Sequence, residues 1–425
     1  IGCVIALWSA GTRLLGSLGG SLSALTLAGM PLIMVNSRWL TADMPMLFWI
    51  AASFACAVHI LKGGGRKWAV AAGIFIGLAA GTRYQGALSA VPVFFACLLR
   101  DRSEGRLPLH RRIAATLRCG DLWLAAVCSI GVFVLVNPYI LLNPVQFWSE
   151  LAGELSGSRS PGSWFINTLL IVVTGFGPLL GMATLGAAAM AVAQRKKEAI
   201  FILAGFGLPC LFLWLNRPVM ARYYLPGILA CPLLVGWTGS VLHRKGCERG
   251  RTPGRLAVPV LLTLILAATI VQSLAYRRLF TDPAADTRTQ AGKWISANVP
   301  AGTTLGAVSI PWQFELPPLN VRKYSMVVKP PDEGLAFSLP EYFVSSDLQL
   351  PPLAIRGPLT DIEYGFWMDV FTDRGEYRVL KRIDVWPVGM KGLLRFGPHD
   401  LRYPKPLIVI SGRREAPVEA SPPLQ

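Results

Sequence analysis

The chain has 425 residues, of which 53% are hydrophobic and 15% are charged, and its formal net charge is +17. Soluble proteins carry about a quarter charged residues, so this composition excludes an ordinary soluble globular protein and favours a membrane protein. The positive charge does not indicate a nucleic-acid partner, because the basic residues gather in short loops between apolar segments, where they mark topology and contact with anionic lipids.

Apolar segments follow one another as far as residue 276, and the remainder reads as soluble protein. We therefore predict a transmembrane domain at 1–276, a soluble extracytoplasmic domain at 277–414 and a disordered tail at 415–425. The apolar stretch 1–10 is too short to cross a bilayer, so we interpret it as the end of a helix that begins before this sequence. With it, we expect about ten transmembrane segments. The others are predicted at 14–35, 44–61, 68–81, 86–99, 122–136, 164–192, 199–215, 223–242 and 256–276.

The distribution of Lys and Arg predicts the orientation. If the loop at Arg13 is cytoplasmic, strict alternation makes the most basic loops cytoplasmic as well, as the positive-inside rule requires. The C-terminal domain then lies on the extracytoplasmic side of the plasma (inner) membrane. The cytoplasmic basic loops are 62–67, 100–118, 195–197 and 244–255, whereas the outer loops hold Arg38, Arg83, Arg159, Arg217 and Arg222.

The first predicted outer loop, 36–45, holds Arg38 and Asp43. Ionisable groups near the membrane are costly unless they have a partner or a function, so both are candidates for substrate binding or catalysis. The alternative for Asp43 is structural, because a carboxylate at a helix start can cap free N–H groups.

The second predicted outer loop is Gly81–Gly86, between two apolar stretches of about 14 residues that would reach only about 21 Å as helices. A hairpin this short would place Arg83 and Tyr84 below the outer membrane surface. A guanidinium at that depth suits a bound phosphate, since Arg offers a planar fork of donors. Alternatively, Arg83 extends to lipid head groups.

A further outer loop, 216–226, brings Arg217, Arg222 and Tyr223 to the same predicted face. Cations and phenols are also ordinary interfacial anchors, but three loops that deliver them to one surface together favour an anion site at the outer leaflet.

The long outer loop 137–162 contains Tyr139, a further candidate for substrate binding, and a segment at 146–154 with an amphipathic pattern. Phe147, Trp148 and Leu151 would share one face of a helix that lies in the membrane interface. Such helices line entrances for lipid substrates or act as anchors.

Four segments of the membrane domain resemble the GT-C glycosyltransferases of the protein O-mannosyltransferase and aminoarabinose transferase kind. They are RWLTADMPMLFW (38–49), GIFIGLAAGTRYQGAL (73–88), NPYILLNPVQFW (137–148) and RYYLPGILACPLL (222–234).

This resemblance implies an inverting enzyme that takes a sugar from a polyprenyl-phosphate carrier and transfers it to a glycan, lipid or protein acceptor. It implies that Arg83, Arg222 and Tyr223 contact the carrier phosphate and that Asp43 has a supporting catalytic role. The family's principal catalytic carboxylate lies in an earlier loop, before the start of this sequence. Relatives often have Lys where Arg83 stands.

The sequence predicts no structural zinc site and no cofactor apart from the lipid-linked donor, and it leaves open whether a metal assists the reaction. The eight cysteines show no close CxxC pair and all precede the C-terminal domain, and the four histidines are widely separated. Without a cysteine, that domain has no disulfide framework either.

The C-terminal domain is expected to be a small α/β or α+β fold. Its pattern predicts a helix at 286–300 and, with many prolines between them, strands at 304–310, 342–345, 377–383 and 407–411. The main alternative function for the whole chain is a transporter or flippase of a lipid-linked glycan, although transporters usually contain internal repeats, and this sequence has no convincing one. A noncatalytic membrane scaffold is the third interpretation.

Overall fold

The structure is a computed structural model of the chain, mostly helical with one small sheet. It divides into two compact units, described separately below. One comprises Ile1–Arg159 and Ile171–Leu274, and the other Ser160–Leu170 and Ala275–Gln425. The residues described are 1–38, 41–100, 108–157, 164–215, 220–248, 252–281, 286–307, 317–320, 322–328, 340–348, 373, 375–384 and 406–414.

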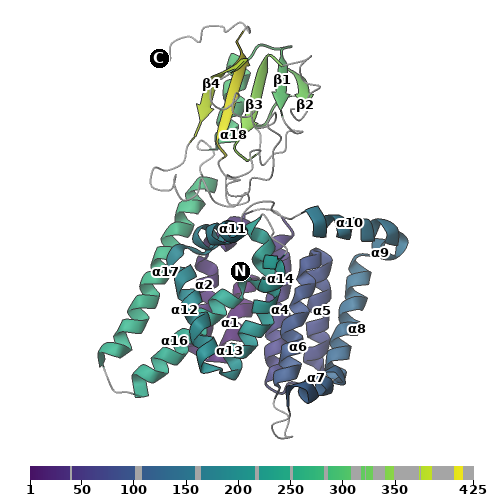
Figure 1. Cartoon of the computed structure of the whole chain (residues 1–425), viewed down its shortest axis with the longest axis vertical. Coiled ribbons are helices and arrows are strands. Elements are labelled where there is room, and N and C mark those ends of the chain that lie inside the picture. The colour runs from purple at the N-terminus through teal and green to yellow at the C-terminus, as the bar shows by residue number, and fades with distance from the viewer. Residues whose placement is uncertain are drawn as a thin grey trace. The chain divides into compact units, whose positions relative to one another are not determined.

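Helices make up the first unit, and their order along the chain can be followed in Figure 1. The N-terminal half comprises α1 (Gly2–Leu15), α2 (Ser17–Gly29), α3 (Pro31–Asn36), α4 (Asp43–Leu61), α5 (Arg66–Thr82), the 3₁₀ helix η1 (Tyr84–Ser89), α6 (Ala90–Leu99), α7 (Leu109–Leu117), α8 (Gly120–Val136), α9 (Tyr139–Leu142) and α10 (Pro144–Gly157). The remainder comprises the π-helix η2 (Val172–Phe176), α12 (Pro178–Gln194), α13 (Lys197–Ile202), the π-helix η3 (Leu203–Gly207), α14 (Leu208–Leu215), η4 (Ala221–Tyr224), α15 (Leu225–Ile228) and α16 (Ala230–Glu248). Two helices belong to both units: α11 (Trp164–Ile171) lies in the second unit up to Leu170, and α17 (Thr252–Thr281) lies in the first unit up to Leu274.

Within the described residues, three helical stretches are long and apolar enough to cross a membrane, and three bent pairs raise the number to six at most. The described part of the chain thus contains apolar helices long enough to cross a membrane, but the predicted number of about ten is not confirmed. The three unbent stretches are Asp43–Leu61, Lys197–Leu215 and Val260–Arg277.

Two predicted spans are broken by backbone features that hydropathy does not register. The stretch predicted at 14–35 is divided at Gly16, which has a φ of 88°, and again before Pro31. The stretch predicted at 164–192 bends by 112° at Gly177, where φ is 92° and the next residue is proline. A positive φ is easily reached only by glycine, so the chain turns at these points.

Glycines bring α5 and α8 into close contact, and the two helices run side by side in Figure 1. Gly73, Gly77 and Gly81 recur every four residues on α5, and a Cβ atom at any of them would collide with α8. Small residues at this spacing let membrane helices approach closely where lipid supplies little hydrophobic driving force. The stripe therefore fixes α5, which carries Arg83 at its C-terminal end, against α8.

The second unit contains a five-stranded mixed sheet in the order β2-β1-β3-β5-β4. β1 pairs in parallel with β2 and β3, whereas β5 pairs antiparallel with β3 and β4. This small mixed sheet follows an expected helix and four expected strands, but β2 falls where the sequence analysis predicted none. The elements are α18 (Thr287–Asn298), β1 (Thr304–Ala307), β2 (Ser325–Val328), β3 (Tyr342–Ser346), β4 (Tyr377–Ile383) and β5 (Ile408–Arg413).

The core of this unit lies between α18 and the sheet. Ala291 and Ile295 of α18 are fully buried against residues such as Leu305 and Ile410 of the strands. Tyr377 is also buried, and its hydroxyl donates a hydrogen bond to the Pro340 carbonyl at 2.7 Å. Burial raises the pKa of this phenol well above its ordinary value.

Candidate active site

The candidate site forms where α4 begins and α5 ends. Asp43 is the first residue of α4 and is 1% exposed. Its carboxylate accepts a hydrogen bond from Nη1 of Arg83, which lies 40 residues further along the chain. The alternative that Asp43 caps its own helix by a hydrogen bond is wrong, because Ala42 is the N-cap and no side chain caps this end, although Asp43 does lie in the first turn, where the helix dipole favours a carboxylate. Burial of the carboxylate is instead compensated by the guanidinium, since a buried charge needs a partner.

The local backbone around Arg83 explains how its side chain reaches Asp43. Arg83 is extended, with φ −153° and ψ 138°, between α5 and η1. Gly86 then packs directly on the Ala79 backbone, where a Cβ would collide, and the Ser89 hydroxyl donates to the Gly86 carbonyl at 2.6 Å. The chain therefore reverses tightly just after α5.

The hairpin is longer than predicted. α5 has 17 residues, so it spans about 25 Å at the rise of an α-helix. The returning arm combines six 3₁₀ residues with the ten of α6, which gives about 27 Å because a 3₁₀ helix rises about 2.0 Å per residue. The predicted arms of about 21 Å were too short, so the position of Arg83 follows from its contacts and not from the depth of a short hairpin.

Tyr223 on η4 covers the guanidinium of Arg83. The Arg83 Cζ lies 5.3 Å from the centroid of the Tyr223 ring, and Cζ of Arg222 lies 5.9 Å from the same centroid. Both distances lie within the range of cation–π attraction. The Arg83 side chain is 21% exposed, so it is held on one side by a carboxylate and on another by an aromatic ring without being sealed off.

Tyr84 connects this region to α10. Its ring makes edge contacts with Phe147 at 5.6 Å and with Phe133 of α8 at 6.5 Å between centroids. Phe147 is 8% exposed, whereas Trp148 is 64% exposed. Phe147 and Trp148 therefore do not share one environment as predicted, because neighbouring residues point about 100° apart around a helix.

The remaining predicted residues lie elsewhere or outside the described residues. The Tyr139 hydroxyl hydrogen-bonds to the side chain of Gln146 in α10, and Nδ2 of Asn143, the residue between α9 and α10, donates to the Tyr139 hydroxyl at 3.2 Å. Arg38 is exposed in the turn after α3. Arg217 falls outside the described part of the chain.

Two polar residues that the sequence analysis did not select also belong to this region. Thr41 Oγ1 and Gln85 Oε1 are buried, and neither has a hydrogen-bond partner among the described residues. Thr41 stands two residues before Asp43, and Gln85 two residues after Arg83. The only sequence signal that could have selected Thr41 and Gln85 is that each stands two residues from a predicted site residue.

The comparisons with known proteins can be set against this geometry. Residues 1–142 match the sequence model of the family described as dolichyl-phosphate-mannose-protein mannosyltransferase. The match includes Asp43, Arg83 and Tyr84. No curated protein sequence matches the chain.

Solved structures of membrane glycosyltransferases are also similar to the chain. Apo ArnT from Cupriavidus metallidurans has 16% identity and a TM-score of 0.49, covering 96% of this chain and 81% of that one. The apo Archaeoglobus fulgidus oligosaccharyltransferase has 12% identity and a TM-score of 0.46, covering 97% and 76%. The arabinofuranosyltransferase AftD from Mycobacteria has 13% identity and a TM-score of 0.43, covering 97% and 33%.

Because these TM-scores are below 0.5, we rest the assignment on the family match. That match covers the segments at 38–49 and 73–88 and half of the segment at 137–148, three of the four segments from which the resemblance was predicted. Over residues 1–142, about a third of its length, the chain is therefore similar to the dolichyl-phosphate-mannose-protein mannosyltransferases.

Proposed function

We propose that the chain transfers a sugar from a polyprenyl-phosphate carrier to an acceptor on the outer side of the membrane, with Arg83 as the principal ligand of the carrier phosphate. The observation that carries the proposal is the arrangement of Arg83 between buried Asp43 and the Tyr223 ring. The matched family is described by a lipid-phosphate-linked sugar donor and a protein acceptor, which supports these two substrate classes.

The proposed reaction needs positive charge where the phosphate leaves. The acceptor hydroxyl forms a bond to the anomeric carbon of the sugar while the bond from that carbon to the phosphate oxygen breaks, with inversion. The hydroxyl proton passes to a base, and the phosphate gains charge as it departs. Oriented donors that meet this developing charge lower the barrier. Arg83 and Arg222, next to the same aromatic ring, are placed to supply them.

Asp43 is a positioning residue in this proposal. Its carboxylate takes one N–H of Arg83, and a guanidinium has five, so the others can donate to phosphate oxygens. The carboxylate oxygen that accepts this hydrogen bond is not free to take the proton of the acceptor hydroxyl. Its supporting role is therefore to hold the guanidinium in one orientation before the donor binds.

Thr41 and Gln85 are proposed to contact the polar part of a substrate. A buried polar atom without a partner costs about 1–3 kcal/mol, so such atoms are usually satisfied by something that binds there. A sugar presents several hydroxyl groups that can donate to Gln85 Oε1 and pair with Thr41. Arg38, Tyr84, Tyr139, Arg217 and Tyr223 remain proposed substrate-binding residues.

We also propose that the enzyme is a multi-pass protein of the plasma (inner) membrane with its C-terminal domain on the extracytoplasmic side. The basic loops support this orientation.

A separate proposal is that the guanidinium groups serve in place of a metal cofactor. Sugar transfer should then persist in a chelator such as EDTA. Complete loss of transfer that added divalent metal restores would contradict this metal-free chemistry.

The phosphate site is tested by comparing two ion pairs of the same type. Arg83 pairs with Asp43, and Arg100 pairs with Asp121 at 2.8 Å, with Arg side-chain exposures of 21% and 26%. We expect Arg83→Ala to lower kcat/KM for polyprenyl-phosphate release more than about tenfold, roughly 1.4 kcal/mol, because transition-state stabilisation is lost. Arg100→Ala should leave kcat/KM within about twofold of the wild type. Equal losses in both variants would show that the effect is structural and would contradict the assignment.

A further inference from the structure

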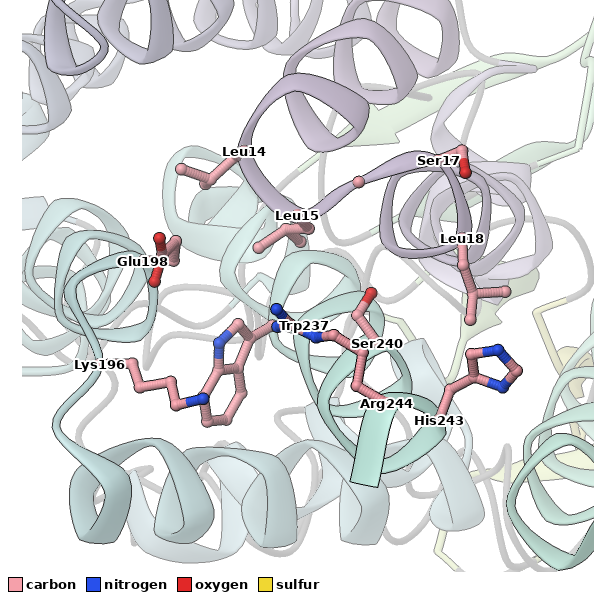
Figure 2. A pocket seen from close by; sticks show the side chains of 11 residues that line it. Leu14, Leu15, Ser17, Leu18, Lys196, Glu198, Trp237, Ser240, His243 and Arg244 are labelled. Atoms are coloured by element: carbon pink, nitrogen blue, oxygen red, sulfur yellow. The ribbon is translucent and has the colours of Figure 1, made fainter. Parts of the chain in front are cut away.

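A cavity of about 610 Å³ lies far from the candidate active site. It is lined by the turn between α1 and α2, by the turn between α12 and α13, and by the last part of α16, as Figure 2 shows. A second cavity of about 260 Å³ shares Glu198 with it and includes Lys62 and Gly63, just beyond α4. Asp43 lies at the other end of the 19-residue α4, so the cavities are about 28 Å from it along this helix.

The polar part of the larger cavity is suited to an anion. Lys196 and Arg244 line it, together with the hydroxyl-bearing Ser17 and Ser240. In the described part of the chain, neither Lys196 nor Arg244 forms an ion pair. One carboxylate, Glu198, lines both cavities, and the smaller cavity adds the cations Lys62 and Lys197. Cations in excess of carboxylates, beside hydroxyl donors, recognise phosphate oxygens.

The rest of the lining is apolar. Leu14, Leu15 and Leu18 face the cavity, as does Trp237, which is 2% exposed overall. Free phosphate gains no binding free energy from these apolar side chains, whereas the first methylene groups of an acyl chain can be buried against them. The mixed lining therefore favours a phospholipid over a small soluble anion.

Helix α7, at the same end of the helices, supports a membrane surface there. α7 follows α6, which returns antiparallel to α5, so it lies at the same end as Lys62. Leu109, Ile113 and Leu117 recur every four residues on α7 and are exposed by 66%, 36% and 50%. Exposed basic residues at 110–112 accompany them. An apolar stripe beside basic residues is typical of a helix in the interface of a membrane with anionic lipids.

We propose that the larger cavity binds the phosphate-bearing head group of an anionic phospholipid, with Lys196 and Arg244 as its ligands and the leucine wall against the start of its acyl chains. Basic pockets between transmembrane helices are known to select anionic head groups. This site is distinct from the donor site and does not depend on the proposed reaction.

The proposal is tested on the full chain in a neutral detergent, with phosphatidylglycerol, phosphatidylcholine and inorganic phosphate as separate probes. Native mass spectrometry measures bound lipid, and the thermal unfolding midpoint gives an independent measure of binding. We expect phosphatidylglycerol to bind more tightly than phosphatidylcholine. The double substitution Lys196→Gln/Arg244→Gln should weaken phosphatidylglycerol binding at least about tenfold, equivalent to about 1.4 kcal/mol.

The control is Lys67→Gln/Lys245→Gln, which removes the same charge from the same end of the helices at residues that line neither cavity. It should bind phosphatidylglycerol as the wild type does. The charge-preserving Lys196→Arg/Arg244→Lys should also retain binding, which separates recognition from misfolding. Equal binding of both lipids, or loss of binding with the charge-preserving pair, would overturn the proposal. Displacement of phosphatidylglycerol by millimolar inorganic phosphate would also overturn it, because the site would then recognise a soluble anion.

Discussion

At the scale of single residues, the ion pair between Arg83 and Asp43 is the contact on which the proposed site depends. Arg83, Asp43 and Tyr223 were selected because ionisable and phenolic groups are costly near lipid without a function. The ion pair joins residues 40 positions apart, and local rules favoured a helix cap for Asp43 instead. Only tertiary packing of α4 against α5 decides between these partners.

Asp43→Asn tests the positioning role of the carboxylate. The amide oxygen can still accept a hydrogen bond, but the charge that orients Arg83 is gone, so we expect kcat for sugar transfer to fall about tenfold or more, with a smaller change in KM. Steady-state kinetics of polyprenyl-phosphate release measures both quantities. Asp121→Asn is the matched control, since it alters the Arg100 pair in the same way. A wild-type kcat in Asp43→Asn would exclude the proposed role.

Tyr377 gives a pH prediction for the C-terminal unit. Its pKa is raised by burial, so the folded state holds the phenol proton more tightly than the unfolded state does. This contribution to stability is fully present below the ordinary tyrosine pKa of about 10 and is lost progressively as the pH rises above that value. Tyr377→Phe should lower the free energy of unfolding by about 1 kcal/mol at neutral pH, through loss of the bond to Pro340, and should flatten this alkaline decline.

The measurement for Tyr377 is thermal unfolding in detergent between pH 8 and pH 11. Tyr324→Phe is a suitable comparison, because its buried hydroxyl also donates to a backbone carbonyl, that of Ile295, at 3.2 Å. An identical alkaline decline in wild type and Tyr377→Phe would show that another group causes it.

At the scale of elements, the hydropathy pattern located apolar segments and missed the places where the backbone turns inside them. Gly16 and Gly177 divide stretches that averaged hydropathy treats as continuous, since one glycine hardly changes such an average. The 112° bend at Gly177 is stabilised by α17, where Gln272 Nε2 donates to the Val173 and Thr174 carbonyls at 3.4 and 3.3 Å. The four-residue spacing of Gly73, Gly77 and Gly81, by contrast, was readable in the sequence.

Gly77→Ala tests whether the glycine stripe holds α5 against α8. The added Cβ would lie 2.6 Å from the Ser129 carbonyl oxygen, so the helices must separate, and we expect a destabilisation of about 1–3 kcal/mol. Gly131→Ala on α8 is the control, because a Cβ there meets nothing within 4 Å. That substitution should be neutral or stabilising by up to about 1 kcal/mol, as alanine is the better helix former. Thermal unfolding in one detergent compares the two variants, and equal midpoints would contradict the packing role.

At the scale of the whole molecule, the sequence predicted a helical membrane part followed by a small mixed α/β part. Strand β2 was missed because its four residues lie between proline-rich segments, where a short run gives little periodic signal. The predicted orientation rests on the positive-inside distribution of Lys and Arg, a property of the loops and independent of how the helices pack.

Reporter fusions after residue 414 test that orientation. Alkaline phosphatase folds into its active form only outside the cytoplasm, because it needs disulfide bonds. We expect an active phosphatase fusion at this position and an inactive one after residue 64, in a basic loop predicted to be cytoplasmic. The reverse pattern would contradict the proposed side of the C-terminal domain and, with it, the outer-leaflet location of the Arg83 site.

The central claim is that this chain transfers a sugar from a lipid phosphate. The most direct measurement supplies the purified protein, extended upstream by any preceding residues of its gene, with a panel of polyprenyl-phosphate sugars labelled in the sugar, together with membrane extract as acceptor. We predict that label appears on an acceptor and that free polyprenyl phosphate is released in equal amount, with both signals lost in Arg83→Ala and retained in Arg100→Ala. Tight binding of the lipid-linked sugars with no donor cleaved would contradict the claim and indicate a protein that moves such lipids instead.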